Sequence, residues 1–140
     1  NEMFKYVLND QSVGAFAGKV LVKENCPRTV AYQGNRNIVA SANAKMYSKP
    51  QLEIYTDDVK CSHGSATGQL NEEALFYMRS RGISEAEARQ LLMQAFMSDV
   101  IDAVRLPALK DRLHHLVEKR FRGQLAMCAD CTAANCAAAK

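Results

Sequence analysis

The pattern of apolar and polar residues changes once along the chain, close to residue 70. Before that point, short runs of β-branched and aromatic residues are separated by small polar corners, a pattern typical of strands. After it, apolar residues recur at intervals of three and four, which is typical of amphipathic helices. The sequence therefore predicts a mixed β and α protein in which the strands come first.

The strands of the first half are predicted to be short. They are expected at residues 4–8, 13–22, 45–47, 50–55 and 59–61, and as two runs within 29–41. Asn9-Asp10 reads as a turn, Gly34-Asn35 and Asn37 as interruptions, and Gly64 and Gly68 as parts of a polar loop. Short strands without intervening helices suit either a sandwich or a β-solenoid, and the absence of an exact internal repeat leaves both open.

Three helices are predicted in the second half. Asn71 can cap a helix over about residues 72–81 that ends at Gly82, and a capping box at Ser84-Glu85-Ala86-Glu87 opens a second helix that runs to about residue 105. Pro107 suits the first turn of a third helix, which ends before Gly123. We expect these antiparallel helices to cover the last coil of the β region and hide an edge that would otherwise invite pairing.

The charge distribution and the apolar content argue against binding to nucleic acid and against a membrane-spanning segment. The formal net charge of +3 divides into +2 for residues 1–70 and +1 for residues 71–140, with both signs interspersed, so no basic stripe for nucleic acid is present. No stretch approaches the roughly 20 apolar residues that span a membrane. The five cysteines are an odd number without paired spacing, which favours reduced thiols and a cytoplasmic protein.

Cys61 and His63 are the first candidate site. Residues two apart on an extended strand lie on the same side, so a thiol and an imidazole can share one ligand or one proton here. Thiolate and imidazole are ligands that iron and iron–sulfur clusters accept. The alternative is a buried cysteine acting as a small apolar residue beside a histidine at a strand corner, because two ligands are too few to define a site.

Three tail cysteines are the second candidate site. Cys128, Cys131 and Cys136 could bind zinc, copper or a cluster if a fourth ligand comes from elsewhere. The alternative is an alanine- and cysteine-rich flexible tail over residues 124–140 with no metal.

No motif of an enzyme is present. The sequence has no nucleotide-binding loop of the GxxxxGK[ST] type, no nucleophile elbow and no His-Glu metalloprotease helix. We therefore expect no catalytic residues and no enzymatic activity in the chain itself.

One long segment resembles a known family. Residues 50–84, PQLEIYTDDVKCSHGSATGQLNEEALFYMRSRGIS, resemble the end of the core domain in the SufB/SufD family, the scaffold proteins of the SUF iron–sulfur cluster assembly machine. The resemblance is sharpest in KCSHG and FYMRSRGI. Ala44 and Gly64 stand where the SufB branch carries a cysteine and a glutamate, so the resemblance favours the SufD branch.

The resemblance implies a fold and a division of the chain. Residues 1–70 would be the last coils of a right-handed parallel β-helix whose earlier coils precede Asn1. Residues 71–123 would form a C-terminal helical domain of about three helices, and residues 124–140 a tail.

The resemblance also implies a function. The chain would be a non-catalytic scaffold that joins a SufB-like paralogue through the β-helix and a SufC-like ATPase through the helices, with Phe76, Arg79 and Arg81 as contacts. His63 matches the position associated with cluster assembly, and Cys61 assists or packs. No tightly bound cofactor is expected, only transient iron or a cluster at a partner interface, and the isolated chain could form a homodimer. The rival functions are a pure interaction module and a metal-handling protein that uses the tail cysteines.

Overall fold

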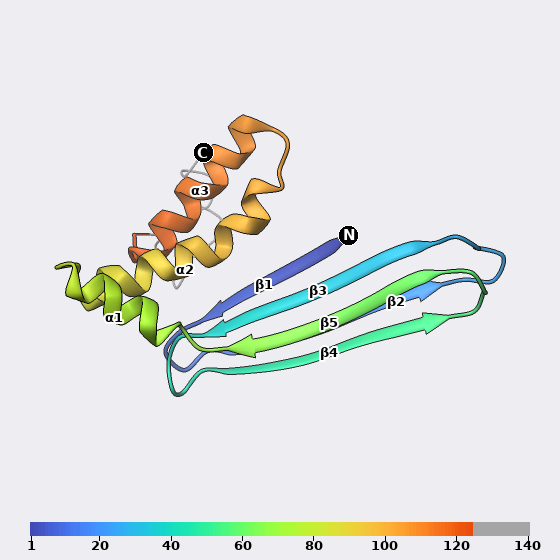
Figure 1. Ribbon diagram of the computed structural model, residues 1–140, viewed down its shortest axis with the longest axis horizontal. Helices are drawn as coiled ribbons and strands as arrows, with labels where there is room; N and C mark the ends of the chain where they lie inside the picture. The colour runs from blue at the N-terminus through green and yellow to red at the C-terminus, as the bar shows by residue number, and fades with distance from the viewer. Residues whose placement is uncertain (125–140) are drawn as a thin grey trace, which may run out of the picture.

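The structure is a computed structural model that describes residues 1–124, and it contains five strands followed by three helices (Figure 1). The strands are β1 (Glu2–Leu8), β2 (Val13–Val22), β3 (Val30–Val39), β4 (Lys45–Ile54) and β5 (Lys60–Gly68). The helices are α1 (Glu72–Ser80), α2 (Glu85–Asp102) and α3 (Pro107–Phe121). The predicted order of strands before helices is confirmed, and none of the helices among residues 1–124 is long and apolar enough to cross a membrane.

The strands form two parallel sheets between which the chain alternates. One sheet has the order β1-β3-β5 and the other pairs β2 with β4, so each strand is followed by a strand of the other sheet. Figure 1 shows β1, β3 and β5 running in one direction and β2 and β4 in the opposite one. Glu2 pairs with Gln33, and Gln33 pairs with His63, so the chain takes about 30 residues to return to the same sheet.

The third, fourth and fifth strands are longer than the sequence pattern predicted, whereas β2 has the predicted bounds. β3 runs without a break through Gly34 and the two asparagines, β4 passes through Pro50, and β5 continues beyond Gly64. The predicted interruptions are therefore wrong. In β4 the reason is that β2 is its one neighbour within residues 1–124, so the missing N–H of Pro50 can fall on the unpaired side.

The space between the two sheets is apolar in one part and polar in another. Leu8, Phe16 and Val22 are buried there, and the ring of Phe16 lies 5.0 Å from that of Phe4. Beside them the side chains of Gln33, Asn35 and Asn37 project from β3 and are also buried. A buried amide group without a hydrogen-bond partner costs free energy, so the two asparagines of the polar part require a network, whereas Gln33 bonds to Glu2 through Nε2 alone.

Asn35 is the centre of that network. Its Oδ1 accepts hydrogen bonds from Asn37 Nδ2 at 2.7 Å, Ser48 Oγ at 2.9 Å and Ser65 Oγ at 3.1 Å, while its Nδ2 donates to Asn37 Oδ1 at 3.0 Å. Asn37 Nδ2 also donates to Thr67 Oγ1 at 3.2 Å. The amides therefore join β3 to β4 and β5, which explains why an asparagine-rich run remains a strand.

The helix ends follow their sequence signals. Asn71 Oδ1 accepts from the N–H of Ala74 at 3.0 Å, and Ser84 Oγ accepts from the N–H of Glu87 at 3.3 Å. Gly82 has φ +88°, and the N–H of Ile83 returns to the carbonyl of Met78 at 3.2 Å, which closes α1 as a Schellman motif. The three predicted helices are confirmed with ends within a few residues of the expected ones.

The helices lie against the first strand rather than the last. α2 packs on β1, and α1 and α3 pack on α2, so that α2 and α3 lie on the β1 side of the strands in Figure 1. The expectation that the helices cover the edge of β5 is therefore wrong. One contact that joins α2 to β1 is the ion pair of 2.6 Å between Lys5, whose side chain is 2% exposed, and Asp99. Among residues 1–124, β5 pairs with β3 alone, and its other edge stays open.

Candidate functional site

The predicted pair, Cys61 and His63, lies on the last strand, β5. The two residues are aligned with Ala31 and Gln33 of β3, and both project from the same face. The side chain of His63 is exposed, whereas Cys61 is half-buried and its thiol lies 3.9 Å from the carbonyl oxygen of Thr29. The structure thus brings the thiol and the imidazole to one side of an open edge strand.

That side of β5 is the one that faces the space between the sheets. Neighbours in register project to the same side, and Gln33 and Asn35, the partners of His63 and Ser65, are buried between the sheets. Ser65 Oγ accordingly lies 2.7 Å from Ser48 Oγ of β4, and its single hydroxyl proton is shared between Ser48 and Asn35. Because β5 is the outermost strand of its sheet in the described part of the chain, His63 remains accessible although it belongs to the interior row.

The pair provides two ligands of different character. A neutral imidazole nitrogen can bind a metal ion without losing a proton, whereas a thiol binds as the thiolate. Cys61 and His63 supply two ligands, and residues 1–124 contain no group of three or more histidine, cysteine, aspartate or glutamate side chains placed to hold one ion. The chemistry of the donor set fits iron or a cluster that is also held by another protein.

The predicted partner-binding residues lie on α1 and its C-terminal end. Phe76 is 74% exposed and its neighbour Tyr77 is 58% exposed, while Leu75 points inward and is buried. Arg79 and Arg81 are also exposed. Two adjacent aromatic residues on the solvent side of a helix, flanked by two arginines, have the composition of a protein-binding surface.

The two arginines differ in how they are held. Arg79 forms an ion pair of 3.4 Å with Glu85, which also pairs with Arg89. The guanidinium of Arg81 lies 5.2 Å from the ring centre of Tyr77, a cation–π arrangement. Arg79 therefore has a structural partner of its own, and Arg81 with Tyr77 forms the more accessible pair.

The three tail cysteines fall outside the described residues. The suggestion that Cys128, Cys131 and Cys136 bind a metal therefore stays a prediction.

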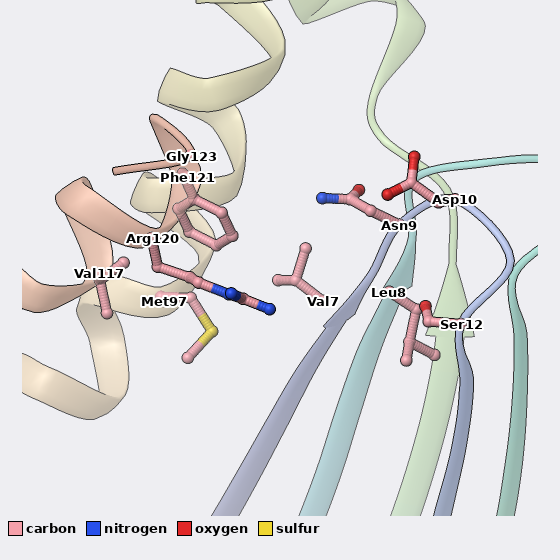
Figure 2. A pocket seen from close by; sticks show the side chains of 10 residues that line it. All are labelled: Val7, Leu8, Asn9, Asp10, Ser12, Met97, Val117, Arg120, Phe121 and Gly123. Atoms are coloured by element: carbon pink, nitrogen blue, oxygen red, sulfur yellow. The ribbon is translucent and has the colours of Figure 1, made fainter. Parts of the chain in front are cut away.

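A cavity of about 680 Å³ lies between the end of β1 and the helices (Figure 2). Its floor is apolar, and Figure 2 shows the side chain of Arg120 extending from α3 toward Val7 of β1. The lining residues are Val7, Leu8, Asn9, Asp10, Ser12, Met97, Val117, Arg120, Phe121 and Gly123. Neither Cys61, His63 nor the aromatic pair of α1 lines this cavity, so the candidate site is an open strand surface and not a pocket.

Sequence reasoning missed two sets of residues that shape this site. Tyr77 could have been found, because the helical period that turns Leu75 and Met78 inward places it outward. The buried amides of Asn35 and Asn37 could not, because asparagine between apolar runs ordinarily marks a turn.

Comparisons with known proteins agree on one family. The family model described as SUF system FeS cluster assembly, SufBD core domain, matches residues 1–96. An iron–sulfur cluster assembly SufBD family protein of Synechocystis sp. is 41% identical over 120 residues, which make up 86% of this chain and 26% of that protein. The iron–sulfur cluster assembly protein SufD of Escherichia coli is 35% identical over 122 residues, 87% of this chain and 29% of SufD.

A plant relative matches a similar part of the chain. The chloroplastic protein ABCI7 of Arabidopsis thaliana is 36% identical over 112 residues, 80% of this chain and 24% of that protein. The chain thus spans roughly a quarter of the length of these relatives.

Proposed function

The chain belongs to the SufBD family of SUF iron–sulfur cluster assembly proteins, and from this premise we propose that it acts as a SufD-like scaffold subunit. The observation that carries the proposal is that Cys61 and His63 share one row of side chains on β5, an edge strand in the described part of the chain, and that His63 in this row is exposed. A scaffold needs a surface between two proteins where iron and sulfide can bind together. A strand that carries a thiol and an imidazole can provide the ligands from one of the two proteins.

We propose that the two sheets are the last coils of a right-handed parallel β-helix. Support comes from the strict alternation of strands between two parallel sheets and from the return to each sheet after about 30 residues. A strand, a connection and a parallel strand in one sheet are right-handed in almost all proteins, which favours the right-handed form. Residues 1–70 then form the β-helical part and residues 71–123 a separate helical domain.

The open edge of β5 is the proposed contact with a SufB-like paralogue. An edge strand offers unpaired N–H and C=O groups that a strand of a second protein can bond. A photo-crosslinking residue in place of Ala66, which is exposed on β5, should couple to the paralogue, whereas one in place of Val13 on the outer face of β2 should not. In isolation the same edge can pair with a second copy of the chain, which would appear as a homodimer in solution.

His63 is the proposed assembly residue of this surface, either as a ligand or as a proton carrier near bound sulfide. Cys61 assists or packs, and its partial burial beside Thr29 favours packing. In a strain that depends on the SUF system, His63→Ala should impair cluster maturation more than Cys61→Ala, with all subunits still associated. Normal maturation by the His63 variant would refute the chemical role.

The aromatic and basic surface of α1 is the proposed docking site of a SufC-like ATPase. ATP hydrolysis then takes place in that partner, and the scaffold contributes no catalytic residue. Phe76→Ala together with Arg81→Ala should weaken co-purification of the ATPase, because exposed aromatic and arginine side chains dominate interface energies. Replacing His115 on the surface of α3 by Ala is a matched control that should leave binding unchanged.

The proposed location is a reducing compartment, since Cys26 and Cys61 are free thiols in the described part of the chain. One relative is a chloroplastic protein, so an organelle is an alternative location to the cytoplasm. Cell fractionation distinguishes the two locations.

A further inference from the structure

The cavity between α3 and the end of β1 has the size and the lining of a small-molecule site (Figure 2). Its volume of about 680 Å³ falls within the roughly 300–1,000 Å³ of typical ligand sites. The apolar side chains that line it come from one strand and two helices, and they are Val7, Leu8, Met97, Val117 and Phe121. An apolar group of a ligand would therefore be removed from water here, which is the main source of affinity in such sites.

Both walls of the cavity are held by hydrogen bonds. On the strand side, the N–H of Asp10 donates to Ser41 Oγ at 2.8 Å. On the helix side, Gln90 Nε2 of α2 donates to the carbonyl oxygen of Phe121 at 3.0 Å, which fixes the end of α3. The cavity is therefore formed without a ligand, and binding requires little ordering of the protein.

Arg120 supplies an unpaired positive charge to the cavity. Figure 2 shows its side chain extending from α3 toward Val7 of β1. Within residues 1–124 its guanidinium group forms no ion pair, whereas Arg122, two residues further along, is paired with Glu118 at 2.7 Å. A guanidinium group can donate two parallel hydrogen bonds to a carboxylate, a phosphate or a sulfonate, and these bonds are stronger beside apolar groups than in water.

Asp10 determines the orientation in which an anionic ligand would fit. Its carboxylate belongs to the turn after β1, and Figure 2 shows it apart from Arg120, with Val7 between them in this view. A negative group of a ligand is repelled by Asp10 and attracted by Arg120, so it lies on the α3 side of the cavity. The apolar part of the ligand is then left to contact Val7, Met97 and Phe121.

We propose that this cavity binds a small molecule with an apolar body and one anionic group, such as a medium-chain fatty acid, and that the anionic group is held by Arg120. The ligand contacts β1, α2 and α3 at once, so it stabilises the packing of the helices on the strands. The proposal does not depend on the cluster assembly function, because neither Cys61 nor His63 lines the cavity.

Octanoate is the probe, and its binding to the full chain is measured by titration calorimetry and by the rise of the thermal midpoint that a ligand of the folded state produces. Octanol has the same apolar chain without a charge, and octylammonium carries the opposite charge. Octanoate should bind at least about tenfold more tightly than either, because both lack the charged hydrogen bonds to Arg120. The methyl resonances of Met97 and Val117 should shift on binding. Vesicles of phosphatidylglycerol present the anionic group on a lipid surface, and the chain should not sediment with them.

Four variants locate the site. Arg120→Met removes the charge, and Arg112→Met is its matched control, since Arg112 is exposed on the same helix and does not line the cavity. Both arginines are exposed, so neither substitution should unfold the protein. Val117→Phe fills part of the cavity. Asp10→Asn removes the carboxylate and introduces a residue that tolerates the φ of +57° found at Asp10.

Arg120→Met should weaken octanoate binding at least about tenfold and leave octanol binding unchanged, whereas Val117→Phe should weaken both. Arg112→Met should bind octanoate like the wild type, and Asp10→Asn should bind it equally or more tightly. Equal affinities of the two arginine variants for octanoate would overturn the proposal. So would weaker binding by Asp10→Asn, methyl shifts confined to residues outside the cavity, or sedimentation with vesicles in the absence of octanoate binding.

Discussion

Replacing Asn35 by Ala removes the centre of the polar network between the sheets. Asn35 is 1% exposed, and its amide is the group through which β3 is bonded to Ser48 of β4 and Ser65 of β5. After the substitution, the hydroxyls of Ser48 and Ser65 keep their mutual bond of 2.7 Å, and Asn37 Nδ2 keeps its bond to Thr67. Asn37 Oδ1, however, loses its donor inside the protein.

The expected loss of stability in Asn35→Ala follows from the hydrogen bonds that are lost. One buried acceptor without a donor costs about 1–3 kcal/mol, and the small cavity left by the amide adds about 1 kcal/mol. We therefore expect Asn35→Ala to lower the free energy of unfolding by about 2–4 kcal/mol. Asn43→Ala is the matched control, because Asn43 is exposed in the turn before β4, where substitutions usually change stability by less than about 0.5 kcal/mol.

Equilibrium unfolding in urea measures the free energy of unfolding of each variant. Hydrogen exchange of the backbone amides shows which strands or helices are destabilised. The exchange of β5 should accelerate in Asn35→Ala more than that of α3, because Ser65 loses its link to β3. A loss below about 1 kcal/mol, or equal changes for the two asparagine variants, would show that the network does not stabilise the sheets.

Three further predictions concern the packing of one glycine, the ionisation of Asp99 and the C-terminal tail. Gly18→Ala should cost about 1–3 kcal/mol in thermal or urea unfolding, since a Cβ there would collide with Gln33 Oε1 and with the ring of Phe16. Gly34→Ala should be nearly neutral because its Cβ meets the flexible end of Met3, and equal costs would refute the packing argument. Lys5 lowers the pKa of Asp99, so the ionised carboxylate of Asp99 stabilises the folded protein at pH values above the usual carboxyl pKa. This stabilisation should be lost as the pH falls below about 4, and the Asp99→Asn variant should not show this loss in acid unfolding. Removing residues 128–140 should leave the thermal midpoint unchanged, and a midpoint lowered by many degrees would indicate that the tail cysteines are docked or metal-bound.

The periodic parts of the fold could be predicted from the sequence. Helix ends marked by Asn71, Gly82, Ser84 and Pro107 were located to within a few residues, because caps and glycine stops act locally. The first two strands were found for a similar reason, since their apolar alternation reflects burial of one face.

What the sequence could not show depends on contacts between distant residues. Asn35 and Asn37 belong to a strand only because Ser48, Ser65 and Thr67 arrive beside them in the fold. A lysine within a strand ordinarily faces solvent, so nothing local marks Lys5 as buried against Asp99, 94 residues away. That contact joins α2 to β1, and the local sequence pattern therefore did not predict on which strand the helices lie.

For the candidate site, the sequence predicts that Cys61 and His63 lie on the same face of a strand, because the alternation of side chains along a strand is a local property. It does not give their different exposure, which depends on β5 being the outer strand of its sheet.

The most direct test of the scaffold function is the yield of iron–sulfur cluster in the purified complex. Wild-type, His63→Ala and His114→Ala complexes are supplied anaerobically with iron, a sulfide source and ATP. The amounts of bound iron and acid-labile sulfide per complex are then determined, and the visible absorption spectrum of each complex is recorded. His63→Ala should reduce the yield by at least about tenfold, the scale of losing a ligand or its supporting partner, while the α3 variant His114→Ala keeps the wild-type yield. A wild-type yield from the His63→Ala complex would contradict the assignment of β5 as the cluster assembly surface.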